Sequence, residues 1–197
     1  HRIQLANERL CLAHCIWLND REMEIIRDTK TKVMHCPSSN LKLGSGIAKV
    51  PELLAMGIPV SLGADGAPCN NNLDMFQEMR LAALIQKPRL GPKSLTAETV
   101  FEMATINGAK TLRMDDQIGS IEVGKKADII LMDLENIHST PAESIYSQVV
   151  YSAHSTDVKT VIIDGKIIMK DREIKTFDVS SVTDEAKREL KKLLRRI

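Results

Sequence analysis

Three short apolar runs in the first third of the chain have the length and composition of buried β-strands. They cover residues 10–18, 31–36 and 58–62. The second run stops at Pro37, which has no N–H to donate to a strand ladder. We therefore predict three strands in this region.

Amphipathic segments between and after these runs predict helices. Asn19-Asp20 can cap a helix that extends to about Thr29 and places Met23 and Ile26 on one face. A helix at 73–86 carries Leu73, Phe76, Ala83 and Leu84 on one face. The other predicted segments are helices at 50–56, 97–105 and 108–114 and a Gly/Ser-containing loop at 41–49. Strands that alternate with helices over short connections predict parallel strands and crossover helices.

Near residue 116 the alternation of strands and helices gives way to short strands joined by turns, and we place a domain boundary there. Strands at 127–132, 158–163 and 166–170 follow, and the turn Asp164-Gly165 joins the last two into a hairpin. Thr140-Pro141-Ala142-Glu143 reads as a capping box that opens a helix to about Ser152. A last helix opens at Ser181-x-x-Asp184. Leucines form a stripe along one face of this helix, and we expect that face to pack on the rest of the protein. Lys and Arg residues cover the other faces, which we expect to be solvated.

Composition narrows the class of protein. With 197 residues and 43% apolar residues the chain can bury a sizeable core, and a net charge of +1 gives no broad attraction to nucleic acid or membrane. Three of the four cysteines lie inside apolar runs, which favours a reducing compartment without a disulfide framework. No apolar run approaches the ~20 residues of a membrane span, so we expect a cytoplasmic protein.

Two titratable residues sit where parallel strands place reactive groups. His14 lies within the first apolar run, and Asp65 follows the third run in the sequence Gly63-Ala64-Asp65-Gly66. An Asp-Gly pair alone is more often an ordinary turn. In a parallel α/β barrel, however, active sites collect at the carboxyl ends of the strands.

The motifs AHCIWL, HCPSSNLKLGSG and LGADGAPCNNNLDMFQEMRLAAL occur in this order and together closely resemble the amidohydrolase superfamily. The nearest branch contains aminohydrolases and chlorohydrolases of heteroaromatic rings, such as methylthioadenosine/S-adenosylhomocysteine deaminases. The resemblance implies an α/β fold. Residues 1–116 would form the C-terminal half of a metal-dependent (β/α)8 TIM barrel, and residues 117–197 part of a small β-sandwich domain with a C-terminal helix.

The resemblance also implies a hydrolytic centre with one divalent metal ion, with Zn preferred over Fe. Asp65 would contact the metal and carry a proton, and His14 would act through a bound water or the substrate. Cys69 lies where many relatives have a substrate-facing Ser. The family's His-x-His pair and its later His and Glu are missing from this sequence, so the metal site is incomplete. His1 better suits the end of a preceding helix.

Other candidate residues have simpler interpretations. His35 is expected to be a hydrogen-bonded structural residue rather than the alternative, a substrate contact. Ser38, Ser39 and Asn40 are expected to hold their loop by side-chain-to-backbone bonds. A zinc site at Cys11, Cys15 and Cys36 is disfavoured, because the Cys-x3-Cys spacing within one strand directs the Cys11 and Cys15 side chains only roughly to the same face. His138 and His154 are expected at the surface.

The resulting hypothesis is the incomplete half of an aminohydrolase that deaminates an adenine-type or related heteroaromatic substrate. Its expected partners are the small substrate, the missing N-terminal half and a second copy in a homo-oligomer. Alone, the chain is expected to be inactive. The alternatives are a related chlorohydrolase or guanine deaminase, and a non-catalytic half-barrel module, whose open sheet edge and apolar lining would associate.

Overall fold

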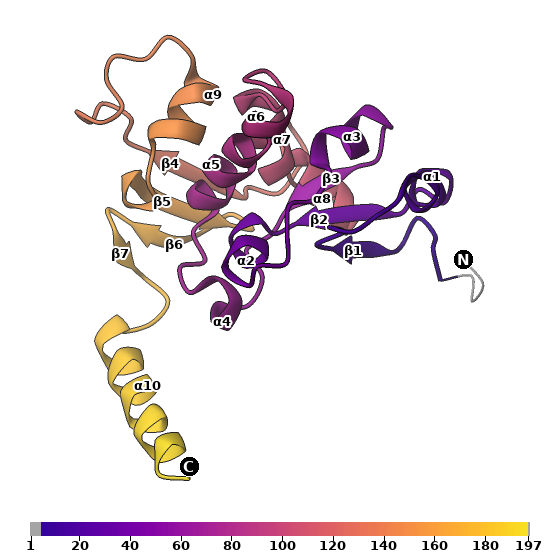
Figure 1. The fold of residues 1–197 in the computed structure, drawn as a ribbon. Coiled ribbons are helices and arrows are strands. Elements are labelled where there is room, and N and C mark those ends of the chain that lie inside the picture. Colours follow the sequence, from indigo (N-terminus) through magenta and orange to yellow (C-terminus); the bar gives the residue numbers. More distant parts are fainter. Residues whose placement is uncertain (1–4, 197) are drawn as a thin grey trace. The chain divides into compact units, whose positions relative to one another are not determined.

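A parallel sheet organises the first half of the chain. The structure is a computed structural model that describes residues 5–196. Strands β1 (Cys11–Ala13), β2 (Lys32–His35) and β3 (Val60–Leu62) pair in that order, and both pairings are parallel. Figure 1 shows the three strands side by side. The prediction of parallel strands is confirmed.

Helices follow each strand of this sheet and supply most of the remaining structure. α1 begins at a complete capping box, in which Asn19 and Glu22 each accept the other's backbone N–H, and it buries Met23 and Ile26 as predicted. The helices are α1 (Asp20–Asp28), α2 (Pro37–Lys42), α3 (Val50–Ala55), α4 (Ala67–Asn70), α5 (Met75–Ile85), α6 (Lys87–Leu90), α7 (Ala97–Ala104), α8 (Ile106–Leu112) and α9 (Ile145–Ser147), which continues as π-helical η1 (Gln148–Ser152).

The core lies between the sheet and the helices α3, α5, α7 and α8. All three residues of β3 are buried, and β3 packs against each of these helices. Val33, Leu53 and Val100 have no exposed surface. The sheet is thus held by apolar burial on its helix-facing side, which is the main stabilising term in folding.

The buried face of α5 differs in part from the predicted one. Phe76 and Ala83 are buried as expected, but Leu73 and Leu84 are 51% and 44% exposed. Leu73 lies outside the helix, because Asp74 is the N-cap and accepts a hydrogen bond from the backbone N–H of Phe76. The face that packs inward also carries a charged residue, Glu78.

Two further expectations for this half are wrong in detail. The first strand is much shorter than the apolar run, and Trp17 in that run is 84% exposed. The predicted loop at 41–49 begins as helix α2, which opens at Pro37 and ends with Lys42. Proline is well suited to a first helical turn because its missing N–H would have no intrahelical partner there.

The second half contains an antiparallel sheet of four strands in the order β4 (Ile129–Met132), β5 (Val158–Ile163), β6 (Lys166–Lys170) and β7 (Glu173–Ile174). A short 3-10 helix, η2 (Ser155–Asp157), precedes β5. The predicted hairpin is confirmed, and its turn residues Asp164 and Gly165 both have positive φ angles of 49° and 74°. Positive φ at both positions is the geometry of a type I′ turn.

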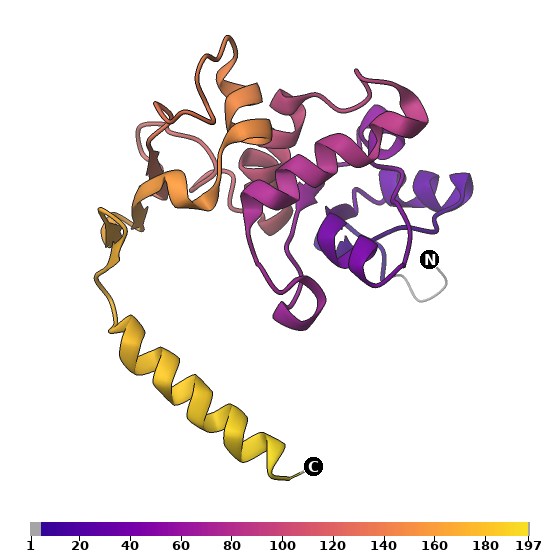
Figure 2. The ribbon, with the colours of Figure 1, turned by 60° about the vertical axis from the view of Figure 1, so that its left-hand side comes forward.

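Two predicted helix starts are wrong. The segment 140–143 is not helical, and Ser144 caps α9 instead by accepting a hydrogen bond from the N–H of Ser147. The last helix, α10 (Val179–Leu194), starts before the expected Ser181, because Asp178 is its N-cap. Figure 2 shows α10 as one uninterrupted helix. None of its residues is buried, so the leucine stripe expected to dock is exposed.

The chain divides into two compact units. One comprises residues 1–125 and 134–155, and the other comprises residues 126–133 and 156–197. The domain boundary near residue 116 stays a prediction about the intact protein. Within residues 5–196, none of the helices has the length and apolar character needed to cross a membrane.

The role of the buried helix-facing core can be tested at Leu53, which has no exposed surface. We expect Leu53→Ala to lower the free energy of unfolding by about 2–5 kcal/mol, through lost burial and a residual cavity. The control is Leu112→Ala, because Leu112 is 62% exposed on α8; we expect a change within about 0.5 kcal/mol. Urea denaturation measures both, and equal effects would contradict this description of the core.

Candidate active site at the carboxyl edge of the parallel sheet

The parallel sheet brings His14 and Asp65 to one edge. His14 directly follows β1, and its N–H donates to the carbonyl of Met34 on β2 at 2.9 Å. Gly63, directly after β3, donates in the same way to the carbonyl of His35 at 2.9 Å, and Asp65 comes two residues later. Since parallel strands end at the same edge, residues 51 positions apart become neighbours.

The two side chains face each other across a short gap. His14 Nε2 and Asp65 Oδ2 are 3.8 Å apart, and the side chains are 42% and 29% exposed. Both residues have a left-handed backbone, with φ of 69° at His14 and 62° at Asp65. This conformation is uncommon outside glycine, although Asn, Asp and His adopt it more readily than other residues. The arrangement lets one small molecule contact both groups.

Asn40 fixes the orientation of the His14 ring. Its Oδ1 lies 2.8 Å from His14 Nδ1, and Asn40 is almost fully buried on α2. An amide oxygen only accepts hydrogen bonds, so Nδ1 carries the proton in this pairing. In the neutral imidazole, Nε2 then has a free lone pair directed toward the Asp65 side.

Ser39 and Gly66 hold Asp65 as a carboxylate. The Ser39 hydroxyl donates to Asp65 Oδ2 at 2.6 Å, and the Gly66 N–H donates to Oδ1 at 2.7 Å. These two bonds, the Ser39 bond first, hold the pKa of Asp65 below its usual value. Asp65 is therefore suited to act as a base or a metal ligand at neutral pH.

Cys69 lies next to Asp65, on the short helix α4. Its thiol is half-buried, and the proximity of Cys69 makes the smallest of the contributions that lower the pKa of Asp65. Proximity to the carboxylate places Cys69 beside the candidate site; a contact with substrate stays a prediction.

The expectation that His35 is hydrogen-bonded is wrong for the described structure. His35 has no exposed surface, and neither ring nitrogen has a hydrogen-bond partner among the described residues. Burial lowers its pKa to about 4, with a further contribution from His14. His35 is therefore a neutral core residue, in contrast to the ionised Asp65 nearby.

The expectation for Ser38, Ser39 and Asn40 is also wrong. The side chains of Ser39 and Asn40 bond to Asp65 and His14 rather than to their own backbone. Ser38 contributes its backbone N–H, which donates to the buried carboxylate of Glu78 at 3.1 Å. The sequence signal for these contacts was a polar triplet directly after a buried strand, where a polar loop is also the ordinary outcome.

The remaining candidates behave as inert or surface residues. Burial raises the pKa of Cys15 and of Cys36 to about 11, so both remain thiols, and the Cys15 thiol donates to the carbonyl of Leu12. His138 and His154 are exposed, as predicted. His1 lies outside the described residues.

Comparison with known proteins identifies the family. The model of the amidohydrolase family matches residues 1–168, which is most of the chain. The chain belongs to the amidohydrolase family. A 5-methylthioadenosine/S-adenosylhomocysteine deaminase of Acetivibrio thermocellus is 53% identical over 184 residues, which are 93% of this chain and 43% of that protein. A 5'-deoxyadenosine deaminase of Methanosarcina acetivorans is 45% identical over 93% of this chain and 42% of its own.

Solved structures of amidohydrolase enzymes share the fold of this chain. A zinc-bound adenosine deaminase from Xanthomonas campestris has a TM-score of 0.95 at 36% identity, and the match covers 100% of this chain and 45% of that one. Zinc-complexed atrazine chlorohydrolase from Arthrobacter aurescens has a TM-score of 0.86 at 26% identity, covering 93% and 41%. The chain thus spans less than half the length of these relatives.

The donor atoms at the edge of the sheet fit part of a metal site. An imidazole nitrogen and a carboxylate oxygen are typical zinc ligands, whereas a zinc site needs at least three protein donors. No group of three His, Cys, Asp or Glu side chains suited to a metal occurs within residues 5–196. Asp65 and His14 can therefore supply two contacts at most.

The hydrogen bond from Ser39 gives a direct test of the Asp65 electrostatics. We expect Ser39→Ala to raise the pKa of Asp65, because the carboxylate loses the strongest of the bonds that stabilise its charged form. Ser39→Thr keeps the hydroxyl and should leave the pKa near its wild-type value. Carboxyl NMR during a pH titration measures both; an unchanged pKa in Ser39→Ala would show that the bond is absent in solution.

Proposed function

We propose that this chain is part of a metal-dependent aminohydrolase that deaminates an adenine-type nucleoside. The pairing of His14 with Asp65 at 3.8 Å carries this proposal, because it places a base and a carboxylate at the edge where barrel enzymes bind substrate. The relatives named as deaminases of 5-methylthioadenosine, S-adenosylhomocysteine and 5'-deoxyadenosine support an adenosine-type substrate.

The proposed fold is the C-terminal half of a (β/α)8 barrel over residues 1–116, followed by part of a small β-sandwich domain. β1 and β3 are edge strands of the three-stranded sheet, and each has one side open to a further strand. Completing a barrel would remove both edges. The antiparallel sheet β4–β7 supports the second part of this proposal.

The proposed chemistry is hydrolytic replacement of a ring amino group. A divalent cation bound at this edge, with Zn as the proposed metal, would lower the pKa of a water toward ~7 and so would supply a strong nucleophile at neutral pH. Asp65 and His14 would face that cation, and the remaining ligands would come from outside these 197 residues.

Within this chemistry the chain's own residues move and orient protons. Asp65, kept ionised by Ser39 and Gly66, accepts the proton of the attacking water and returns it to the leaving amine. His14, with its Nδ1 proton held by Asn40, offers the Nε2 lone pair to orient the water or the substrate. Cys69, beside Asp65, is the proposed substrate contact.

A chlorohydrolase is the second candidate, because atrazine chlorohydrolase shares the fold at 26% identity. The same carboxylate and imidazole would serve displacement of chloride. The deaminase is preferred because the relatives with deaminase names are 44–53% identical.

Asp65 and His14 can be tested in the full-length protein that contains this chain. We expect Asp65→Asn and His14→Asn each to lower kcat for ammonia release from 5'-deoxyadenosine or methylthioadenosine by about 10²–10⁴-fold, the usual contribution of a proton-transferring group. The control is Asp28→Asn, because Asp28 is exposed at the end of α1 and should leave kcat unchanged. Chloride release from a chlorotriazine, without ammonia release, would favour the second candidate.

The isolated 197-residue chain tests whether further ligands are needed. We expect it to bind zinc weakly and to release no ammonia, because its described residues offer no three-donor group. Equilibrium dialysis with metal analysis and an ammonia assay measure these properties. Tight stoichiometric zinc together with turnover in this chain would contradict the proposal.

A further inference from the structure

Glu78 is a buried carboxylate within the apolar face of α5. It has no exposed surface, and Met79 and Ala82, which lie on the same side of the helix, are also buried. Both of its oxygens are bonded: Oε2 accepts from the Ser38 N–H at 3.1 Å, and Oε1 accepts from Asn70 Nδ2 at 2.8 Å. Burying a carboxylate is costly unless directed hydrogen bonds compensate the lost hydration. A glutamate at this position therefore needs an explanation beyond packing.

The two partners of Glu78 lie on the two short helices beside the candidate site: Ser38 is on α2, and Asn70 is the last residue of α4. Ser38 immediately precedes Ser39 and Asn40, whose side chains bond to Asp65 and His14. Asn70 uses the same Nδ2 to donate to the carbonyl of Ala64 at 2.8 Å, next to Asp65.

Asn70 also organises its own loop through its other atom. Its Oδ1 accepts from the backbone N–H groups of Asn72 at 3.1 Å and Leu73 at 2.8 Å. The chain between Asp65 and the start of α5 is therefore fixed around one amide, and that amide is fixed by Glu78.

We propose that Glu78 is a positioning residue for the candidate site. Through Ser38 and Asn70 its carboxylate sets the distance between α2, which carries Ser39 and Asn40, and the segment that runs from Asp65 into α4. The catalytic consequence rests on the function proposed above. The juxtaposition that Glu78 controls is the 2.6 Å bond from Ser39 to Asp65 and the 3.8 Å approach of His14 to the same oxygen.

The geometry gives a specific way to break and to restore this link. Glu78→Gln replaces one acceptor oxygen by an NH2 group, which is a donor. Because Ser38 and Asn70 both donate to residue 78, one of these two hydrogen bonds is lost and two donor groups then face each other. Asn70→Asp makes the opposite error, because two carboxylate oxygens then face each other. In the double variant the introduced amide donates to the introduced carboxylate, and the amide oxygen accepts from the Ser38 N–H. The bond from residue 70 to the Ala64 carbonyl is still lost, so recovery should be partial.

The experiment measures kcat, KM and zinc affinity in the full-length protein for wild type, Glu78→Gln, Asn70→Asp and the double variant. We expect each single variant to lower kcat by about 10²-fold, the effect of roughly 1 Å of misplacement, while KM stays within a few-fold. Zinc affinity, from chelator competition, should fall in the single variants because Asp65 is displaced. The double variant should recover at least about tenfold of kcat and part of the zinc affinity.

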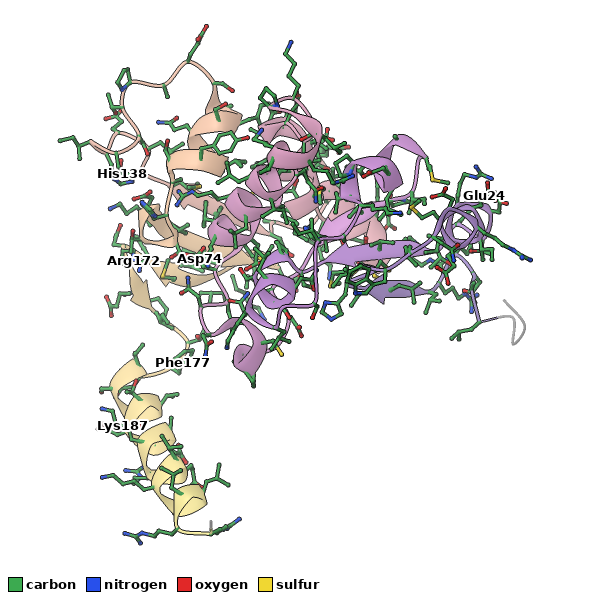
Figure 3. The ribbon with its side chains drawn as sticks, in the orientation of Figure 1. Glu24, Asp74, His138, Arg172, Phe177 and Lys187 are labelled. Atoms are coloured by element: carbon green, nitrogen blue, oxygen red, sulfur yellow. The ribbon has the colours of Figure 1, made fainter. Side chains whose placement is uncertain are left out.

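The matched control is Glu24→Gln, which makes the same chemical change on the exposed surface of α1, where Figure 3 labels Glu24. It should leave kcat, KM and zinc affinity unchanged. Thermal unfolding of every variant separates a loss of fold from a loss of positioning.

Three outcomes would overturn the positioning role. The first is a single variant with a lowered Tm but an unchanged kcat and zinc affinity, and the second is a double variant no better than the product of the singles. If the single variants do not fold, the double variant alone decides, and failure of that variant to fold or to turn over is the third. A wild-type protein that binds zinc but releases no ammonia would contradict the proposed function instead, and the zinc affinities would still test Glu78.

Discussion

The parallel pairing of β1, β2 and β3 is the constraint on which the rest of the structure depends. Cys11 pairs with Lys32 and Val33 pairs with Val60, so the strands advance together and end at one edge. That edge is where His14 follows the first strand and Asp65 the third. A slip of one residue would turn every side chain of a strand to the other face. Burial of Val33 and Val60 on the helix side therefore fixes the register, and with it the meeting of the two residues.

Hydrogen bonding keeps Asp65 ionised, whereas burial keeps the neighbouring His35 neutral. Ser39 and Gly66 donate to Asp65, so the carboxylate remains ionised. His35 ends the middle strand, its ring nitrogens have no hydrogen-bond partner among the described residues, and burial keeps the ring neutral. His14 is half-exposed, and its Nδ1 is bonded to Asn40. The same edge thus combines one fixed anion with one imidazole that has a lone pair free for chemistry.

Sequence patterns predicted the elements that are formed by interactions between residues close together in the chain. The helix cap at Asn19, the Asp164-Gly165 hairpin and the three strands follow from residues within a few positions of each other. The bonds from Ser39 to Asp65 and from Asn40 to His14 each join residues 26 positions apart, and no local pattern encodes them. The capping box at 140–143 failed for a related reason. Ser144 offers a competing cap four residues after Thr140, and local propensity cannot rank the two.

Glu78 shows why a helical pattern gave only part of the buried face of α5. A periodicity argument assigns a charged residue to the solvent side, because an unpaired buried charge is unstable. Here the partners come from the short helices α2 and α4, at positions 40 and 8 residues away in the chain. The same hydrogen bonds that make a buried glutamate tolerable here also connect α2 with α4 beside the candidate site. Glu78 therefore belongs both to the packed side of α5 and to the hydrogen bonds beside the candidate site, so a substitution of this residue tests both.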